Sequence, residues 1–123
     1  STGTVLPALL VLAFLLPLAA ISGAAPPPEK KVLVVMSYHQ GNTWQDEERA
    51  GIDSLLTDVD VSYFYLDAKR NKEGASARAA EAFALYEKLR PDAVLAADDP
   101  AQAMFVVPYL SGKVETPVIF PGV

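Results

Sequence analysis

Residues 31–52 read KVLVVMSYHQGNTWQDEERAGI, and this stretch decides the fold. Five apolar residues, Val32 to Met36, follow one another without alternation and stop at a polar, glycine-containing loop, Ser37 to Asn42. A short apolar run bounded by turn residues is typical of a strand that is buried on both faces. The stretch therefore predicts a buried strand, a loop and a helix in succession.

The start of this helix is predicted from Thr43 and Asp46, which are spaced as a capping box. In such a box the hydroxyl group accepts a hydrogen bond from the backbone N–H three residues on, and the carboxylate reaches back. The pattern predicts a helix over about 44–57. Its buried face is expected to carry Ile52, Leu55, Leu56 and Val59.

Three more strands are predicted at 61–66, 92–97 and 116–120, from β-branched, aromatic or continuous apolar residues. A helix over about 75–89 is expected, with one side made of Ala79, Phe83, Tyr86 and either Leu89 or Arg90.

A third helix is expected after 92–97. Asp99 suits its N-cap and Pro100 its first position, and Pro108 is expected to end it near Val107. Strict alternation of strands and helices predicts an α/β fold with three layers and a parallel sheet with right-handed crossovers, in the order 2-1-3-4.

Length and composition exclude several classes of function. The 123 residues suffice for one domain, and the net charge of −5 with a pI near 4.7 gives no electrostatic footprint for nucleic acid. Cysteine is absent and His39 is the single histidine, which excludes disulfides and thiolate or multi-histidine metal sites within this chain. We expect no metal and no cofactor.

The first 28 residues contain no charged side chain. Residues 1–25 are read either as a cleaved signal peptide, with small residues near Ala24, or as a retained membrane anchor. Residues 26–30 form a Pro-rich linker, expected to be a stiff tether. Residues 31–123 are then an exported, periplasmic or otherwise extracytoplasmic domain.

Polar side chains follow each predicted strand, and in a parallel sheet these loops meet at one rim where ligands bind. The candidate ligand-binding residues are Ser37, Tyr38, His39, Trp44, Asp67, Lys69, Asp98, Asp99 and Gly122.

Each group of candidates has a second interpretation. The loop Ser37 to His39 either contacts a polar small molecule or satisfies its own backbone. Trp44 is either a stacking wall or a hydrophobic plug. Asp67 either contacts a ligand or pairs with the adjacent basic residues. Capping accounts for Asp99, which leaves Asp98 as the stronger contact candidate.

The residues do not assemble a catalytic set. A phosphoacceptor receiver domain needs its acidic pair after the first strand, where this chain has Ser37 and Tyr38. His39 has no serine partner in an elbow motif, and the first loop holds Gly41 as its one glycine, short of a phosphate-binding pattern. The sequence therefore predicts a binding protein and no enzyme.

Four segments carry a resemblance to a known family: SYHQGNTW at 37–44, YLDAKR at 65–70, ADDPA at 97–101 and PVIFPGV at 117–123. In this order and spacing they resemble the ABC-transporter substrate-binding protein family, which has a type I periplasmic-binding fold. They are particularly similar to the branch that also serves as extracytoplasmic sensor domains. Ala97 and Pro100 depart from the family pattern, which commonly has serine and asparagine there.

The resemblance implies that residues 31–123 are the N-terminal lobe of such a protein, a Rossmann-like half whose second lobe is missing here. Ligand would lie between two lobes that close by a hinge. The implied partners are a small-molecule ligand and an ABC permease. The alternative is a ligand-sensing domain of a membrane-bound histidine kinase or diguanylate cyclase. We also expect the strand at 116–120 to leave an apolar edge.

Overall fold

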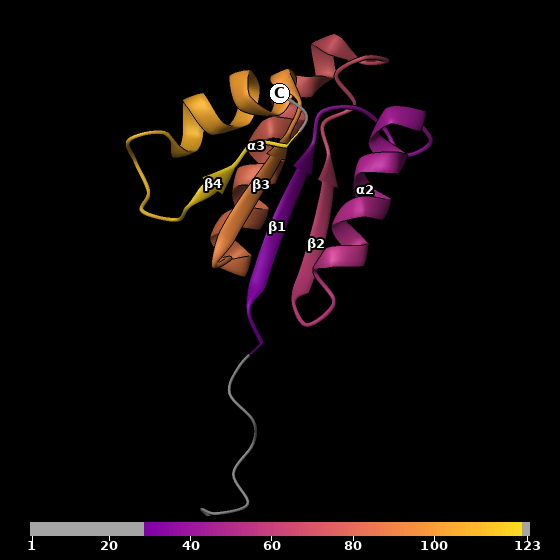
Figure 1. Ribbon diagram of the computed structural model, residues 1–123. Coiled ribbons are helices and arrows are strands. Elements are labelled where there is room, and N and C mark those ends of the chain that lie inside the picture. The colour runs from indigo at the N-terminus through magenta and orange to yellow at the C-terminus, as the bar shows by residue number, and fades with distance from the viewer. Residues whose placement is uncertain (1–28, 122–123) are drawn as a thin grey trace, which may run out of the picture.

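A computed structural model describes residues 29–121 (Figure 1). Its elements are β1 (Lys31–Met36), α2 (Thr43–Leu55), β2 (Asp60–Tyr65), α3 (Lys72–Leu89), β3 (Ala93–Ala97), α4 (Asp99–Ala101), the π-helix η2 (Gln102–Leu110) and β4 (Val118–Ile119). The predicted leader, most of the Pro-rich linker and Gly122 lie outside the described residues. Within 29–121, no helix combines the length and the apolar character needed to cross a membrane.

The four strands form one parallel sheet in the order β2-β1-β3-β4, which confirms the predicted fold class and strand order. β1 is central: Val34 lies opposite Tyr63 of β2 and Leu95 of β3. The residues from Leu33 to Met36 are fully buried, as the uninterrupted apolar run predicts.

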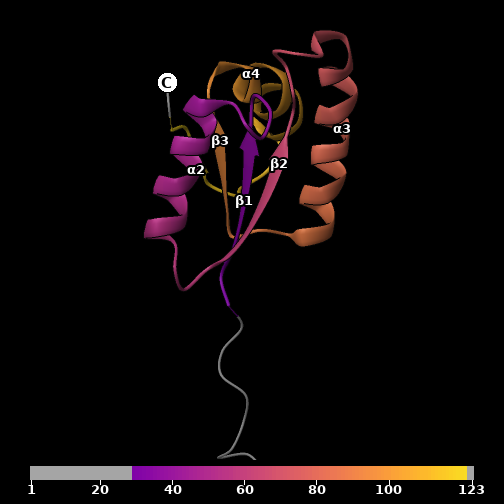
Figure 2. The same cartoon turned by 90° about the vertical axis from the view of Figure 1, so that its right-hand side faces the viewer.

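Helices cover both faces of the sheet and make three layers. Figure 2 shows α2 on one side and α3 on the other. Alternate residues of β1 divide between two cores: Leu33 and Val35 pack with Phe105 of η2, while Val34 and Met36 pack with Ile52 of α2. Successive side chains of a strand point to opposite faces of the sheet. The crossover through α2 runs from β1 to β2 and the one through α3 runs back from β2 to β3, so right-handed crossovers place these two helices on opposite faces.

The cap of α2 differs from the prediction. Asn42 is the N-cap, and its side-chain oxygen accepts a hydrogen bond of 3.2 Å from the backbone N–H of Gln45. Thr43 is already helical, so the predicted capping box is wrong in its first member. The Asp46 carboxylate does reach back, but to the backbone N–H of Gly41, at 3.1 Å. Asparagine is as good an N-cap as threonine. Asn42 stands one position before Thr43, and from there its side-chain oxygen reaches the backbone N–H of Gln45, which has no partner within the helix.

The buried side of α3 is lined by alanine. Ala75, Ala79 and Ala82 are buried, whereas the predicted Phe83 and Tyr86 are only partly buried and pack at the margin of the core. The helix also begins earlier than predicted, because the Asn71 side chain accepts a hydrogen bond of 3.0 Å from the N–H of Gly74.

The predicted end of the third helix is wrong. Asp98 precedes α4 and Asp99 is its first residue, so Asp99 is not the N-cap. The chain then continues as η2 through Pro108 to Leu110. In an α-helix the proline ring clashes with the carbonyl group four residues back. In a π-helix the hydrogen bonds run to the carbonyl group five residues back. The backbone N–H of Ser111 donates such a bond, of 2.8 Å, to the carbonyl oxygen of Val106.

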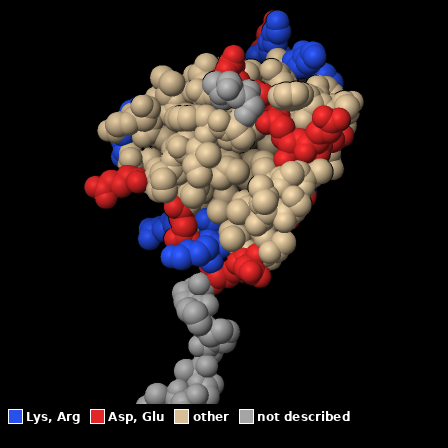
Figure 3. Space-filling view, viewed as in Figure 1, with Lys and Arg blue, Asp and Glu red and all other residues tan. Residues whose placement is uncertain are grey.

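The α2 side of the sheet is only partly covered. β4 is shorter than predicted, and Ile119 and Phe120 are 55% and 45% exposed. An apolar hollow of about 300 Å³ lies between α2 and β3, lined by Val32, Ile52, Leu55, Leu56, Ala93, Leu95 and Ile119. Figure 3 shows this side, with charged side chains around the margin and an uncharged middle. The expected apolar edge is therefore present.

The central strand gives a direct test of the fold. Leu33→Ala removes a fully buried side chain and is expected to lower the free energy of unfolding by about 3 kcal/mol. The matched control is Leu55→Ala, because Leu55 is 82% exposed and its loss is expected to cost less than about 0.5 kcal/mol. Urea unfolding measures both variants; equal losses would contradict the described core.

Candidate binding site at the carboxyl edge of the sheet

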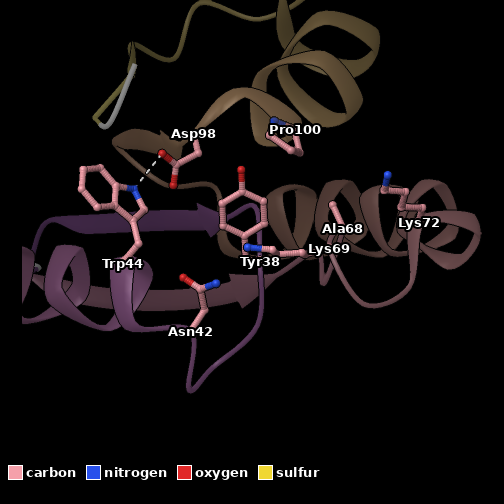
Figure 4. A pocket seen from close by; sticks show the side chains of 8 residues that line it. All are labelled: Tyr38, Asn42, Trp44, Ala68, Lys69, Lys72, Asp98 and Pro100. Atoms are coloured by element: carbon pink, nitrogen blue, oxygen red, sulfur yellow. Dashed lines mark hydrogen bonds between the residues drawn. The ribbon is translucent and has the colours of Figure 1, made fainter.

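A pocket of about 490 Å³ lies where the strands end (Figure 4). Its lining comes from the loop after β1, the start of α2, the loop after β2 and the segment after β3. The lining residues are Tyr38, Asn42, Trp44, Ala68, Lys69, Lys72, Asp98 and Pro100. This is the edge at which parallel sheets bind ligands, and the volume suits a small molecule.

Asp98 is fixed at one wall of this pocket. It is 6% exposed and adopts φ +71°, a conformation uncommon outside glycine. The indole Nε1 of Trp44 donates a hydrogen bond of 3.1 Å to Oδ1, and Nε2 of Gln45 donates one of 2.7 Å to Oδ2. The carboxylate therefore joins the first turn of α2 to the end of β3.

Gln45 was not predicted from the sequence and has a central position. It is fully buried, and its Oε1 accepts a hydrogen bond of 2.8 Å from the backbone N–H of Tyr38. One amide group thus connects the loop after β1 with Asp98. The signal available in the sequence was its place directly after Trp44, in the first turn of a helix that faces the sheet.

Trp44 is not a hydrophobic plug. Its side chain is 54% exposed, and Figure 4 shows the ring beside Asp98 with its nitrogen directed at the carboxylate. The hydrogen bond sets the orientation of the ring, and its exposed part remains available for stacking.

Tyr38 presents its phenol group to the pocket. Burial raises the pKa of this phenol, and the carboxyl groups of Asp98, Asp99 and Glu48 raise it further. The Lys69 ammonium stands over the ring, 5.9 Å from its centroid. Tyr38 and Lys69 therefore form an aromatic and cationic wall.

Ser37 supports the site from behind. Its buried hydroxyl group donates a hydrogen bond of 2.6 Å to the carbonyl of Ala97 and accepts one of 2.8 Å from the N–H of Ala101. The hydroxyl group thus satisfies backbone groups, but those of β3 and α4 and not, as predicted, those of its own loop.

Asp67 and His39 lie outside the pocket lining. Arg70 donates two hydrogen bonds to Asp67, of 2.9 and 3.2 Å, and these lower the pKa of the Asp67 carboxyl group. Nδ1 of His39 is 3.7 Å from Asp67. The structural pairing considered for Asp67 is confirmed.

Asp99 lines a second, neighbouring hollow of about 410 Å³. This hollow shares Ala68, Lys72 and Pro100 with the first, and Ala103 and Met104 make its far side apolar. The sequence did not predict four of the lining residues, although all four stand in or next to the loops that hold the predicted ones: Asn42, Ala68, Lys72 and Pro100.

Of the predicted site residues, the pocket brings together Tyr38, Trp44, Lys69 and Asp98. Across residues 29–121 no group of three or more histidine, aspartate or glutamate side chains is arranged to hold a metal ion.

Comparisons with family models, with curated proteins and with solved structures found no match.

The Ser37 bridge is testable by removing one oxygen. Ser37→Ala leaves a buried N–H and a buried carbonyl group without their partner, and is expected to cost about 1–3 kcal/mol of unfolding free energy. Ser54→Ala is the control, since the Ser54 hydroxyl is exposed and bonds only to Gly51 O within its own helix. An equally small effect of both changes in urea unfolding would contradict a supporting role for Ser37.

Proposed function

We propose that residues 31–123 form one lobe of an extracytoplasmic solute-binding protein of an ABC transporter, which captures a small molecule and delivers it to a permease. The observation that carries the proposal is the pocket at the carboxyl edge, whose walls come from loops after three different strands. The order and spacing of the four family-like segments support it as well. In this proposal a second lobe supplies the opposite wall.

Capture without chemistry is favoured by how the reactive groups are used. The Ser37 hydroxyl is held by two backbone groups, and the Asp67 carboxylate is bound by Arg70. Neither is free to act as a nucleophile or a base toward a molecule in the pocket.

The lining favours a polar ligand of modest size. Lys69 and Lys72 offer positive charge, and Tyr38 and Trp44 offer aromatic faces. Asp98 keeps acceptor capacity beyond its two hydrogen bonds, because a carboxylate has about four lone-pair sites. Amino acids, sugars and small organic acids all fit this description.

A second candidate is a ligand-sensing domain of a membrane-bound signalling protein. The charge-free run through residue 28 supports it, because such a run also suits a retained anchor. N-terminal sequencing of the mature protein separates the two candidates. Cleavage near Ala24 supports the transport protein, and a retained leader supports the sensor.

Ligand binding is tested by screening amino acids, sugars and organic acids against the full-length protein for a rise in melting temperature. For a hit, Trp44→Ala and Lys69→Ala are each expected to weaken binding about tenfold, the loss of roughly 1.4 kcal/mol. Lys88→Ala, on the exposed side of α3, is the control and is expected to leave affinity unchanged. Unchanged affinity in both pocket variants would refute the assignment of the site.

A further inference from the structure

Glu48 is a buried carboxyl group beside the pocket that the proposed binding mode does not use. It lies on α2, three residues after Gln45 and four after Trp44, so all three share one helix face. Both other residues donate hydrogen bonds to Asp98. Both carboxyl oxygens of Glu48 are inaccessible to solvent and have no hydrogen-bond partner among the described residues. An ionised carboxylate in such a place is costly.

The groups that face Glu48 are mostly acidic. Asp98 comes from the junction of β3 and α4, and the Tyr38 phenol, whose pKa Glu48 helps to raise, comes from the loop after β1. Lys69 provides positive charge over the Tyr38 ring. Burial first, and then the Asp98 carboxyl group, raise the pKa of Glu48 to about 7, while the Gln45 amide group acts in the opposite direction.

We infer that Glu48 is a positioning residue of the pocket: its carboxyl group keeps a proton next to Asp98, and this keeps the Trp44 indole in place at the pocket mouth. When Glu48 loses its proton to solvent, two carboxylates face each other. Their repulsion weakens the hold of Asp98 on Trp44, so the pocket wall loosens as the pH rises. The inference rests on the proposed function in one respect, because that function makes this pocket a ligand-binding site.

The sign of the effect follows from proton linkage. The pKa of Glu48 is about 7 in the folded protein and 4.5 ordinarily, so the folded state binds the proton more tightly. The contribution of Glu48 to stability is fully present below about pH 4.5 and is lost as the pH rises through about 7. We therefore expect the pocket wall to be most ordered toward pH 4.5 and to loosen as the pH approaches 7.

Trp44 is the single tryptophan of the chain, so intrinsic fluorescence reports the pocket mouth directly and needs no ligand. We expect the emission maximum and the iodide quenching of the 123-residue chain to change together, with a midpoint near pH 7. Glu48→Gln is expected to abolish this transition. Glu47→Gln removes an exposed neighbouring glutamate, and His39→Gln removes the single imidazole; both are expected to retain the transition.

Three results would overturn the inference: no transition in the unchanged chain, a transition that persists in Glu48→Gln, or one that disappears in His39→Gln. Glu48→Leu is a second variant that cannot titrate and suits a buried site, and circular dichroism verifies that each variant is folded. A protein that binds a screened ligand but lacks the transition refutes this inference alone. A protein that shows the transition but binds none of the screened classes counts against the proposed function alone.

Discussion

The pocket depends on one buried carboxylate that links two parts of the sheet edge. Asp98, at the end of β3, accepts hydrogen bonds from Trp44 and Gln45 in the first turn of α2. Gln45 extends the link to the backbone of Tyr38, and Ser37 ties the end of β1 to the start of α4. These hydrogen bonds form one network behind the wall of the pocket. Glu48 lies beside this network, and both of its carboxyl oxygens are buried without a hydrogen-bond partner among the described residues.

The fold was predictable because its strongest signals are local. A parallel strand covered on both faces has to be apolar at every position, and Val32 to Met36 show this pattern. The boundaries were less predictable, since Asn42 and Thr43 are both good caps and the choice depends on which oxygen meets the free N–H of Gln45. The end of the third helix was predicted wrongly, because Pro108 lies inside a π-helix and such helices are too rare to be expected from sequence.

Some pocket residues could be predicted from their position alone, in a loop that directly follows a strand. Tyr38, Lys69 and Asp98 are of this kind. Sequence patterns did not reveal Gln45 and Glu48, because their burial depends on how α2 is rotated against the sheet and on a partner more than fifty residues away. Ser37 was predicted as a ligand-binding residue, but it is buried, does not line the pocket, and bonds through its hydroxyl group to the backbone of β3 and α4.

The central position of β1 has a consequence for how the chain is made. Lys31 pairs with Asp60, and Val32 pairs with Ala93, so the first strand to be synthesised is completed only by strands that emerge much later. Parallel pairing over such separations forms slowly. During translation β1 therefore stays without its neighbouring strands until residues 60–65 and 93–97 have been synthesised.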